Sequence, residues 1–167
     1  HGDHVFGLIG LISTFRLLNS STKLKVFGPK GIKKLIVTQL TLTESYATFP
    51  VEFHELDSKE SELIYEDDKV TIETIPLNHR IYTNGYLFKE KIGKRKLNLP
   101  EIEKHKEIEI CDYNNLKAGK DFKLISGDTI PNSQLTFDPV PPSSYAFCSD
   151  TAYKPDICDI IKEVSVL

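Results

Sequence analysis

Three potential metal ligands stand within the first four residues of the chain. His1, Asp3 and His4 surround a single glycine and directly precede a segment with helical apolar spacing. Neutral imidazole and carboxylate groups are good ligands for zinc or manganese, and a loop that ends at a helix can direct them to one side. Histidine and aspartate also cluster by chance on solvated surfaces, which is the alternative interpretation of this spacing.

Two further polar residues follow predicted strands. His79 lies in a loop after one strand and Asp150 at the end of another, positions where α/β folds assemble their sites. A loop histidine is also commonly structural or solvated, and Asp150 could instead begin a turn or cap a helix. His54 falls within a predicted strand and His105 in a basic stretch, so neither is assigned a metal.

The elements that must position these residues alternate between helix and strand. Apolar residues at i, i+3 and i+4 predict helices over residues 5–19 and 31–43. Period-two patterns predict strands over 23–27, 51–56, 85–91 and 145–149, and a hairpin over 62–75. A last helix is expected from Pro155 to about residue 163, followed by a strand over 164–167. This mixture favours a layered α/β sandwich.

Residues 92–143 lack clear periodicity and are rich in Lys, Pro, Gly, Asn and Asp. An irregular segment of this length in a compact domain is usually functional or disordered. From Lys89 to Lys106 there are seven basic and three acidic residues, a local charge of +4 in a chain whose net charge is −3. Such a run suits polyanion binding, although a solubilising surface is the ordinary alternative.

Composition excludes several classes of protein. The chain of 167 residues is 40% hydrophobic and has no run of 18 apolar residues, so no membrane span is expected. Three cysteines without a C-x-x-C pair favour a reducing, cytoplasmic setting over a disulfide framework. The chain contains no Met, even at position 1, so we expect either that its start has been removed or that it is an internal segment of a longer protein.

Four motifs together resemble ribonuclease Z, the tRNA 3′-processing endonuclease of the metallo-β-lactamase superfamily. The H-G-D-H sequence and the glycine-rich helix after it resemble the end of the family's H-x-H-x-D-H motif. Residues 27–32 resemble its G-P-x-G turn, residues 76–86 its P-L-x-H…G-Y segment, and residues 147–151 its S-D-T segment. The resemblance implies an α/β fold: a partial metallo-β-lactamase αββα sandwich with an inserted flexible-arm region. Residues 1–167 would form a single incomplete domain, with 92–143 as the insertion.

The resemblance also implies two Zn²⁺ ions. One would be held by His1, His79 and Asp150 and the other by Asp3, His4 and Asp150, with Asp150 bridging. Asp3 would in addition orient or deprotonate the attacking water. The family has one further histidine ligand for each metal. One lies two residues before the position of His1 and the other in a segment after residue 167, so both fall outside these 167 residues. The chain alone is therefore expected to bind zinc weakly or not at all and to be nearly inactive.

Precursor tRNA is the substrate that the resemblance implies, cut at a phosphodiester at its 3′ end. Lys94, Arg95 and Lys96 would grip tRNA phosphates from the arm, and the complete protein would be a cytoplasmic homodimer with no membrane partner. Two alternatives stay open: another metallo-β-lactamase-fold hydrolase of a small substrate, and a metal-free RNA-binding fragment. The basic run argues against a hydrolase of a small substrate, because such a substrate needs no phosphate contacts far from the metals.

Overall fold

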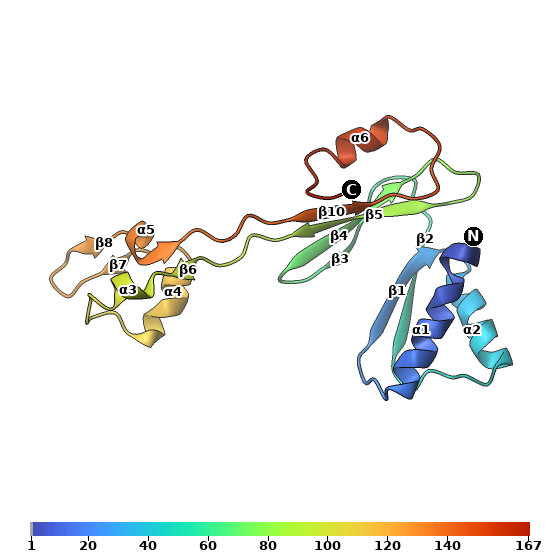
Figure 1. Ribbon diagram of the computed structural model, residues 1–167, viewed down its shortest axis with the longest axis horizontal. Helices are drawn as coiled ribbons and strands as arrows, with labels where there is room; N and C mark the ends of the chain where they lie inside the picture. The colour runs from blue at the N-terminus through green and yellow to red at the C-terminus, as the bar shows by residue number, and fades with distance from the viewer. Residues whose placement is uncertain (1) are drawn as a thin grey trace. The chain divides into compact units, whose positions relative to one another are not determined.

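A computed structural model describes residues 2–167, which divide into two compact units (Figure 1). The first unit contains the residues up to 64 together with 74–85 and 148–160, and the second contains 65–73, 86–147 and 161–167. The mixed α/β class expected from the sequence is confirmed by the elements of both units. No helix within residues 2–167 is long and apolar enough to cross a membrane.

A parallel pair of strands organises the beginning of the first unit. Strand β1 (Leu24–Pro29) pairs with β2 (Val51–Leu56), from Leu24 opposite Val51 to Pro29 opposite Leu56. Parallel strands need a crossover, which α2 (Ile32–Leu42) supplies. The short η1 (Gly2–His4) and helix α1 (Phe6–Leu17) precede them, close to the predicted helix bounds (Figure 1). The buried core joins these elements and consists of Ile12, Val26, Ile32, Ile36, Leu40 and Phe49.

The turn between β1 and α2 depends on one glycine. Gly31 has φ +96°, a left-handed conformation that side chains rarely adopt, and it directly precedes α2. Its N–H donates to the Glu55 carboxylate at 2.9 Å, and the N–H of Lys33 approaches the same oxygen at 3.3 Å. A carboxylate from β2 therefore satisfies the first N–H groups of α2, where the helix dipole favours negative charge.

An antiparallel sheet has the strand order β10-β5-β4-β3. Its strands are β3 (Leu63–Glu66), β4 (Val70–Pro76), β5 (Asn84–Glu90) and β10 (Ser144–Phe147), which confirms the predicted hairpin and strands. The last predicted helix is too long, because α6 covers only Asp156–Ile160. Glu163 has φ +66°, which a right-handed helix does not tolerate. The predicted strand over 164–167 is reduced to one parallel bridge between Tyr145 and Val166.

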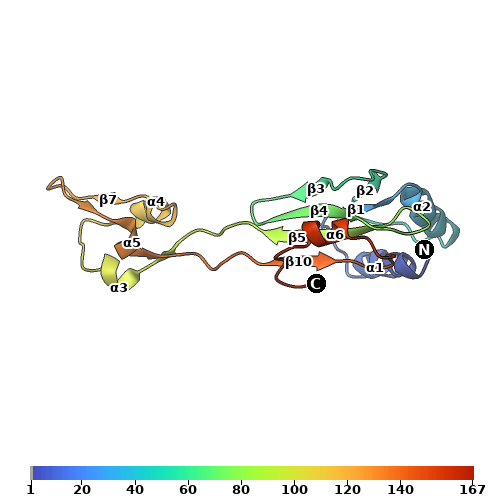
Figure 2. The same ribbon diagram turned by 90° about the horizontal axis from the view of Figure 1, so that it is seen from above.

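Residues 92–143, here called the inserted module, lie between β5 and β10 and contain short ordered elements (Figure 2). They are β6 (Lys96–Leu97), α3 (Leu99–Ile102), η2 (Ile110–Asp112), α4 (Tyr113–Lys117), β7 (Phe122–Lys123), β8 (Thr129–Ile130), α5 (Asn132–Leu135) and β9 (Thr136–Phe137). A core of their own is formed by Ile102, Ile108, Leu116, Ile130 and Leu135. The segment expected to be irregular is therefore folded, but its elements are too short to show a period along the sequence.

The turn between β3 and β4 is capped by one carboxylate. Asp67 accepts hydrogen bonds from the backbone N–H groups of Lys69 at 2.7 Å and Val70 at 2.8 Å, which hold the pKa of Asp67 below its ordinary value. A lowered pKa means that this contribution to stability is present above about pH 4 and is lost as the pH falls through the folded-state pKa.

We therefore expect Asp67→Ala to accelerate amide hydrogen exchange in the β3–β4 hairpin at pH 7, because two N–H groups lose their acceptor. The difference from the unchanged chain should shrink as the pH falls from about 4 through the lowered folded-state pKa, where the Asp67 carboxylate takes up a proton. Asp68→Ala, which changes the neighbouring exposed carboxylate, is the matched control. Equal exchange in both variants would contradict the assigned cap.

Candidate metal centre

Four of the five candidate ligands lie within the described residues, at the ends of elements or in the loops that follow them. Asp3 and His4 close η1 just before α1. His79 lies in the loop after β4, and Asp150 lies in the loop after β10. All four belong to the first compact unit. His1, the fifth candidate, lies outside the described residues.

His4 brings the two ends of the sequence pattern together. Its Nε2 atom lies 2.9 Å from an Asp150 carboxylate oxygen and 3.5 Å from an Asp3 carboxylate oxygen. The side chains of His4, Asp3 and Asp150 are 44%, 74% and 36% exposed to solvent, respectively. Solvent and a substrate can therefore reach all three. An imidazole and two carboxylates thus converge at the surface, and His4 contacts both carboxylates.

The loop of His79 is joined to the loop of Asp150 through neighbouring residues. The N–H of Asn78 donates to the Thr151 hydroxyl at 3.1 Å, and the N–H of Ala152 donates to the Asn78 carbonyl at 2.7 Å. The Nε2 atom of His79 itself is shielded from solvent. Asn78 and Thr151 were not singled out by sequence reasoning, although both lie inside the motifs that were.

Asp150 holds an uncommon backbone conformation. Its φ of +47° is left-handed, a region in which non-glycine residues cost on the order of 1–3 kcal/mol and which aspartate and asparagine tolerate best. The hydrogen bonds of its neighbours Thr151 and Ala152 to the His79 loop accompany this conformation. Backbone of this kind clusters at functional sites, where surrounding contacts maintain it.

The donor types fit a divalent metal, but in the present arrangement His4 contacts the two carboxylates directly. Within residues 2–167, no three His, Cys, Asp or Glu side chains are arranged to hold a metal ion. The Nε2 atom of His4 contacts Asp150. Burial raises the pKa of the Cys148 thiol, which disfavours a thiolate ligand two residues before Asp150.

The two control histidines have other contacts. The His54 ring stacks on Phe27, with centroids 4.6 Å apart and planes 13° from parallel. His105 lies 3.8 Å from a Glu101 carboxylate oxygen in the inserted module. These contacts agree with leaving both residues out of the candidate metal centre.

The basic run from Lys89 to Lys106 is partly neutralised by ion pairs. Lys89 pairs with Glu73 at 3.1 Å, Lys91 with Glu66 at 2.5 Å and Lys104 with Glu101 at 2.6 Å. Arg95 pairs with Asp138. Of the seven basic residues, Lys94, Lys96 and Lys106 form no ion pair with any residue of the described range 2–167. The three candidate tRNA contacts therefore differ: Lys94 and Lys96 are exposed, whereas Arg95 is engaged within the protein.

Comparison with known proteins identifies relatives along the entire chain. It is 41% identical over 167 residues to ribonuclease Z of Bacteroides thetaiotaomicron and 41% identical to that of Porphyromonas gingivalis, with 100% of this chain matched in each case. Ribonuclease Z of Cytophaga hutchinsonii is 36% identical over 99% of the chain. The chain spans about half the length of these relatives, 52%, 55% and 53% respectively. No family model matches.

Among solved structures, human tRNase Z, short form, overlaps with 55% of this chain and 41% of its own, at 30% identity and a TM-score of 0.48. The whole-length sequence matches confirm the resemblance to ribonuclease Z that the motifs indicated.

Proposed function

Since the chain is homologous over its whole length to about half of ribonuclease Z, we propose that it contributes to a metal-dependent endoribonuclease that cuts precursor tRNA at its 3′ end. The observation that carries this proposal is the contact between His4 and Asp150. These residues come from two motifs at opposite ends of the chain, yet their side chains meet at 2.9 Å in the first unit. Convergence of ligand-type residues from distant motifs is what a metal site requires.

The residues that would hold two zinc ions are His1, Asp3, His4, His79 and Asp150. Bound zinc would supply Lewis acidity at the scissile phosphate. Asp150 would offer its two carboxylate oxygens to both positions, because it already contacts His4 and its loop is bonded to the His79 loop. Asp3 would orient the attacking water and accept a proton from it, and its carboxylate is open to solvent.

The inserted module supports an RNA substrate over a small one. It has a core separate from that of the first unit and presents exposed lysines, features that a small substrate does not need. Recognition through phosphates and shape suits a structured RNA. That residues 1–167 form one incomplete domain, and that the complete protein is a cytoplasmic homodimer, remain parts of this proposal.

The direct test incubates the full-length product of the encoding gene with zinc and a precursor tRNA that carries a 3′ trailer. We expect one cut near the end of the acceptor stem, with a 3′-hydroxyl on the tRNA, detected by end mapping. We expect the 167-residue chain alone to cut far more slowly, because groups that act as a unit lose activity non-additively when some are missing. Zinc removal by a chelator should stop the cut.

The two alternatives give different results in the same assay. A hydrolase of small substrates would cleave a model phosphodiester or thioester and leave the precursor tRNA intact. A metal-free RNA-binding protein would bind the precursor with equal affinity before and after chelation and would not cut it. Either pattern would contradict the proposed endonuclease.

A further inference from the structure

The neck of the inserted module, residues 94–97, places alternate residues of the basic run on opposite sides. Lys94 and Lys96 are exposed, whereas Arg95 is only 26% exposed and Leu97 packs against the module core. This alternation is the period of two expected of extended backbone leading into β6. Basic residues that are consecutive in the sequence therefore lie on opposite faces of this extended segment.

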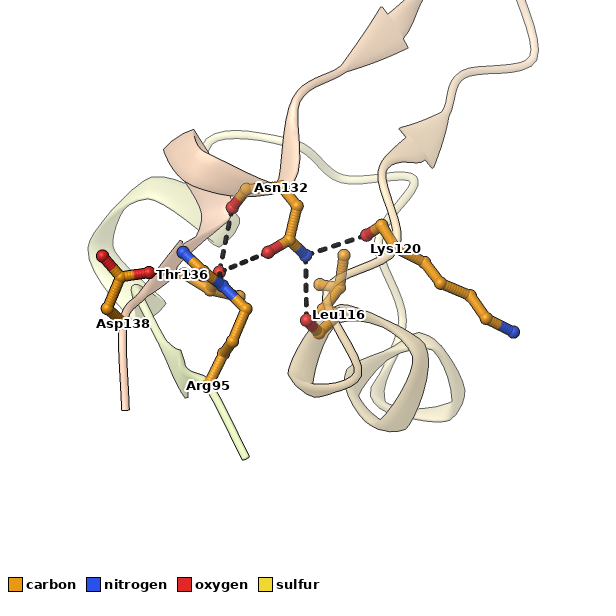
Figure 3. A network of polar contacts seen from close by, with 6 residues as sticks. All are labelled: Arg95, Leu116, Lys120, Asn132, Thr136 and Asp138. Carbon is orange, nitrogen blue, oxygen red and sulfur yellow. Dashed lines mark hydrogen bonds and ion pairs between the residues drawn. The ribbon is translucent and has the colours of Figure 1, made fainter. Parts of the chain in front are cut away.

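Arg95 is bonded to two segments of the module, and its side-chain contacts are drawn in Figure 3. Its Nε–H donates to the Thr136 hydroxyl at 2.7 Å, and its guanidinium pairs with Asp138. Its backbone N–H donates to the Lys117 carbonyl at the end of α4, with an N···O distance of 3.1 Å. The planar guanidinium is suited to this fixed, many-donor role.

Thr136 extends these contacts into a polar network around the end of α4 (Figure 3). The hydroxyl of Thr136 lies 2.7 Å from the side-chain oxygen of Asn132 and 3.0 Å from its carbonyl. The side-chain amide of Asn132 in turn donates to the Leu116 and Lys120 carbonyls, both at 2.8 Å. Asn132 and Thr136 are buried at 6% and 2% exposure, so each of their polar groups needs a partner.

We infer that Arg95, although it belongs to the basic run, is a positioning residue that fixes the inserted module through Thr136 and Asn132 and does not itself contact RNA phosphates. This inference rests on the proposed function for its RNA contacts. Residues 92–143 contain eight basic and eight acidic side chains, so the module has no net charge to attract RNA. Binding must depend on where unpaired cations are held, and Arg95 is already paired with Asp138.

The experiment measures amide hydrogen exchange of the module and the affinity for a precursor tRNA across a salt series, with the full chain. Thr136→Val removes the hydroxyl without changing any charge, and Arg95→Gln removes the cation. For both we expect exchange in α4 and α5 to become about tenfold faster, as expected when one or two hydrogen bonds are removed. Affinity should weaken while the slope of log affinity against log salt stays the same.

The matched variant is Lys94→Ala with Lys96→Ala. We expect unchanged exchange and a salt slope shallower by roughly 1.4–1.8, at about 0.7–0.9 for each phosphate that the protein no longer neutralises. Arg95→Lys guards against a variant that fails to fold, since it keeps the charge but lacks the Nε–H that donates to Thr136. It should reproduce the faster exchange of Thr136→Val.

Two outcomes would overturn the inference. If Arg95→Gln lowers the salt slope by about 0.7–0.9 and leaves exchange unchanged, Arg95 binds a phosphate directly. If Thr136→Val and Arg95→Lys both leave exchange unchanged, the network does not fix the module. Failure of the unchanged chain to bind tRNA would count against the proposed function, and the exchange measurements would still decide the structural role of Arg95.

Discussion

Asp150→Asn is expected to weaken zinc binding by the full-length gene product at least ~100-fold, because loss of a direct ligand exceeds the 10–100-fold cost of losing an outer-shell partner. Asp150 is the one residue proposed to serve both metal positions, and its carboxylate already contacts His4 at 2.9 Å. Asparagine keeps the size of the side chain and tolerates the φ of +47°, so backbone strain does not confound the result. Calorimetric titration of the full-length gene product with zinc measures the loss.

In the full-length gene product, the same substitution should lower the rate of precursor tRNA cleavage by on the order of 10⁴-fold, the scale seen when one member of a catalytic unit is removed. His54→Ala and His105→Ala are the controls, because these histidines contact Phe27 and Glu101 away from the candidate centre. Both should bind zinc as the unchanged chain does. The assigned ligands are wrong if Asp150→Asn binds zinc with unchanged affinity. They are also wrong if His54→Ala loses as much zinc affinity as Asp150→Asn does.

Leu135→Ala is expected to destabilise the inserted module by about 2–5 kcal/mol, the usual cost of a buried leucine truncation. Leu135 is fully buried in the module core, and few other buried side chains share that core. Because the core of the first unit consists of other residues, the loss should be local. Amide exchange should therefore accelerate throughout residues 96–137, and affinity for precursor tRNA should fall with it, while zinc binding stays unchanged.

The control for this prediction lies in the same module. Ile125 is 91% exposed between β7 and β8, so Ile125→Ala removes a similar apolar group without opening a cavity. Its exchange should match that of the unchanged chain. Loss of zinc binding in Leu135→Ala would show that the two cores are not independent. If the module unfolds and the affinity for precursor tRNA is unchanged, the module does not take part in RNA recognition.

Local order along the chain was determined by the sequence to a large extent. Helices α1 and α2 follow from apolar spacing, and Gly31 marks the turn that separates β1 from α2. Gly28 and Pro29, which the sequence suggested as the break, still belong to β1. The sequence predicts His4, His79 and Asp150 as candidate ligands from their residue types and from their places at the ends of elements. These features depend on neighbours close in the sequence, so a local pattern carries them.

Only the tertiary structure decided which distant residues meet. The contact between His4 and Asp150 requires the loop after β10 to reach the end of η1, and no local pattern encodes that closure. The same holds for the inserted module, whose elements of two to five residues are stabilised by a shared core rather than by their own periodicity. In the sequence Arg95 is one cation of a basic run, because a sequence shows its charge but not the buried hydroxyl of Thr136 and the carboxylate of Asp138 that engage it.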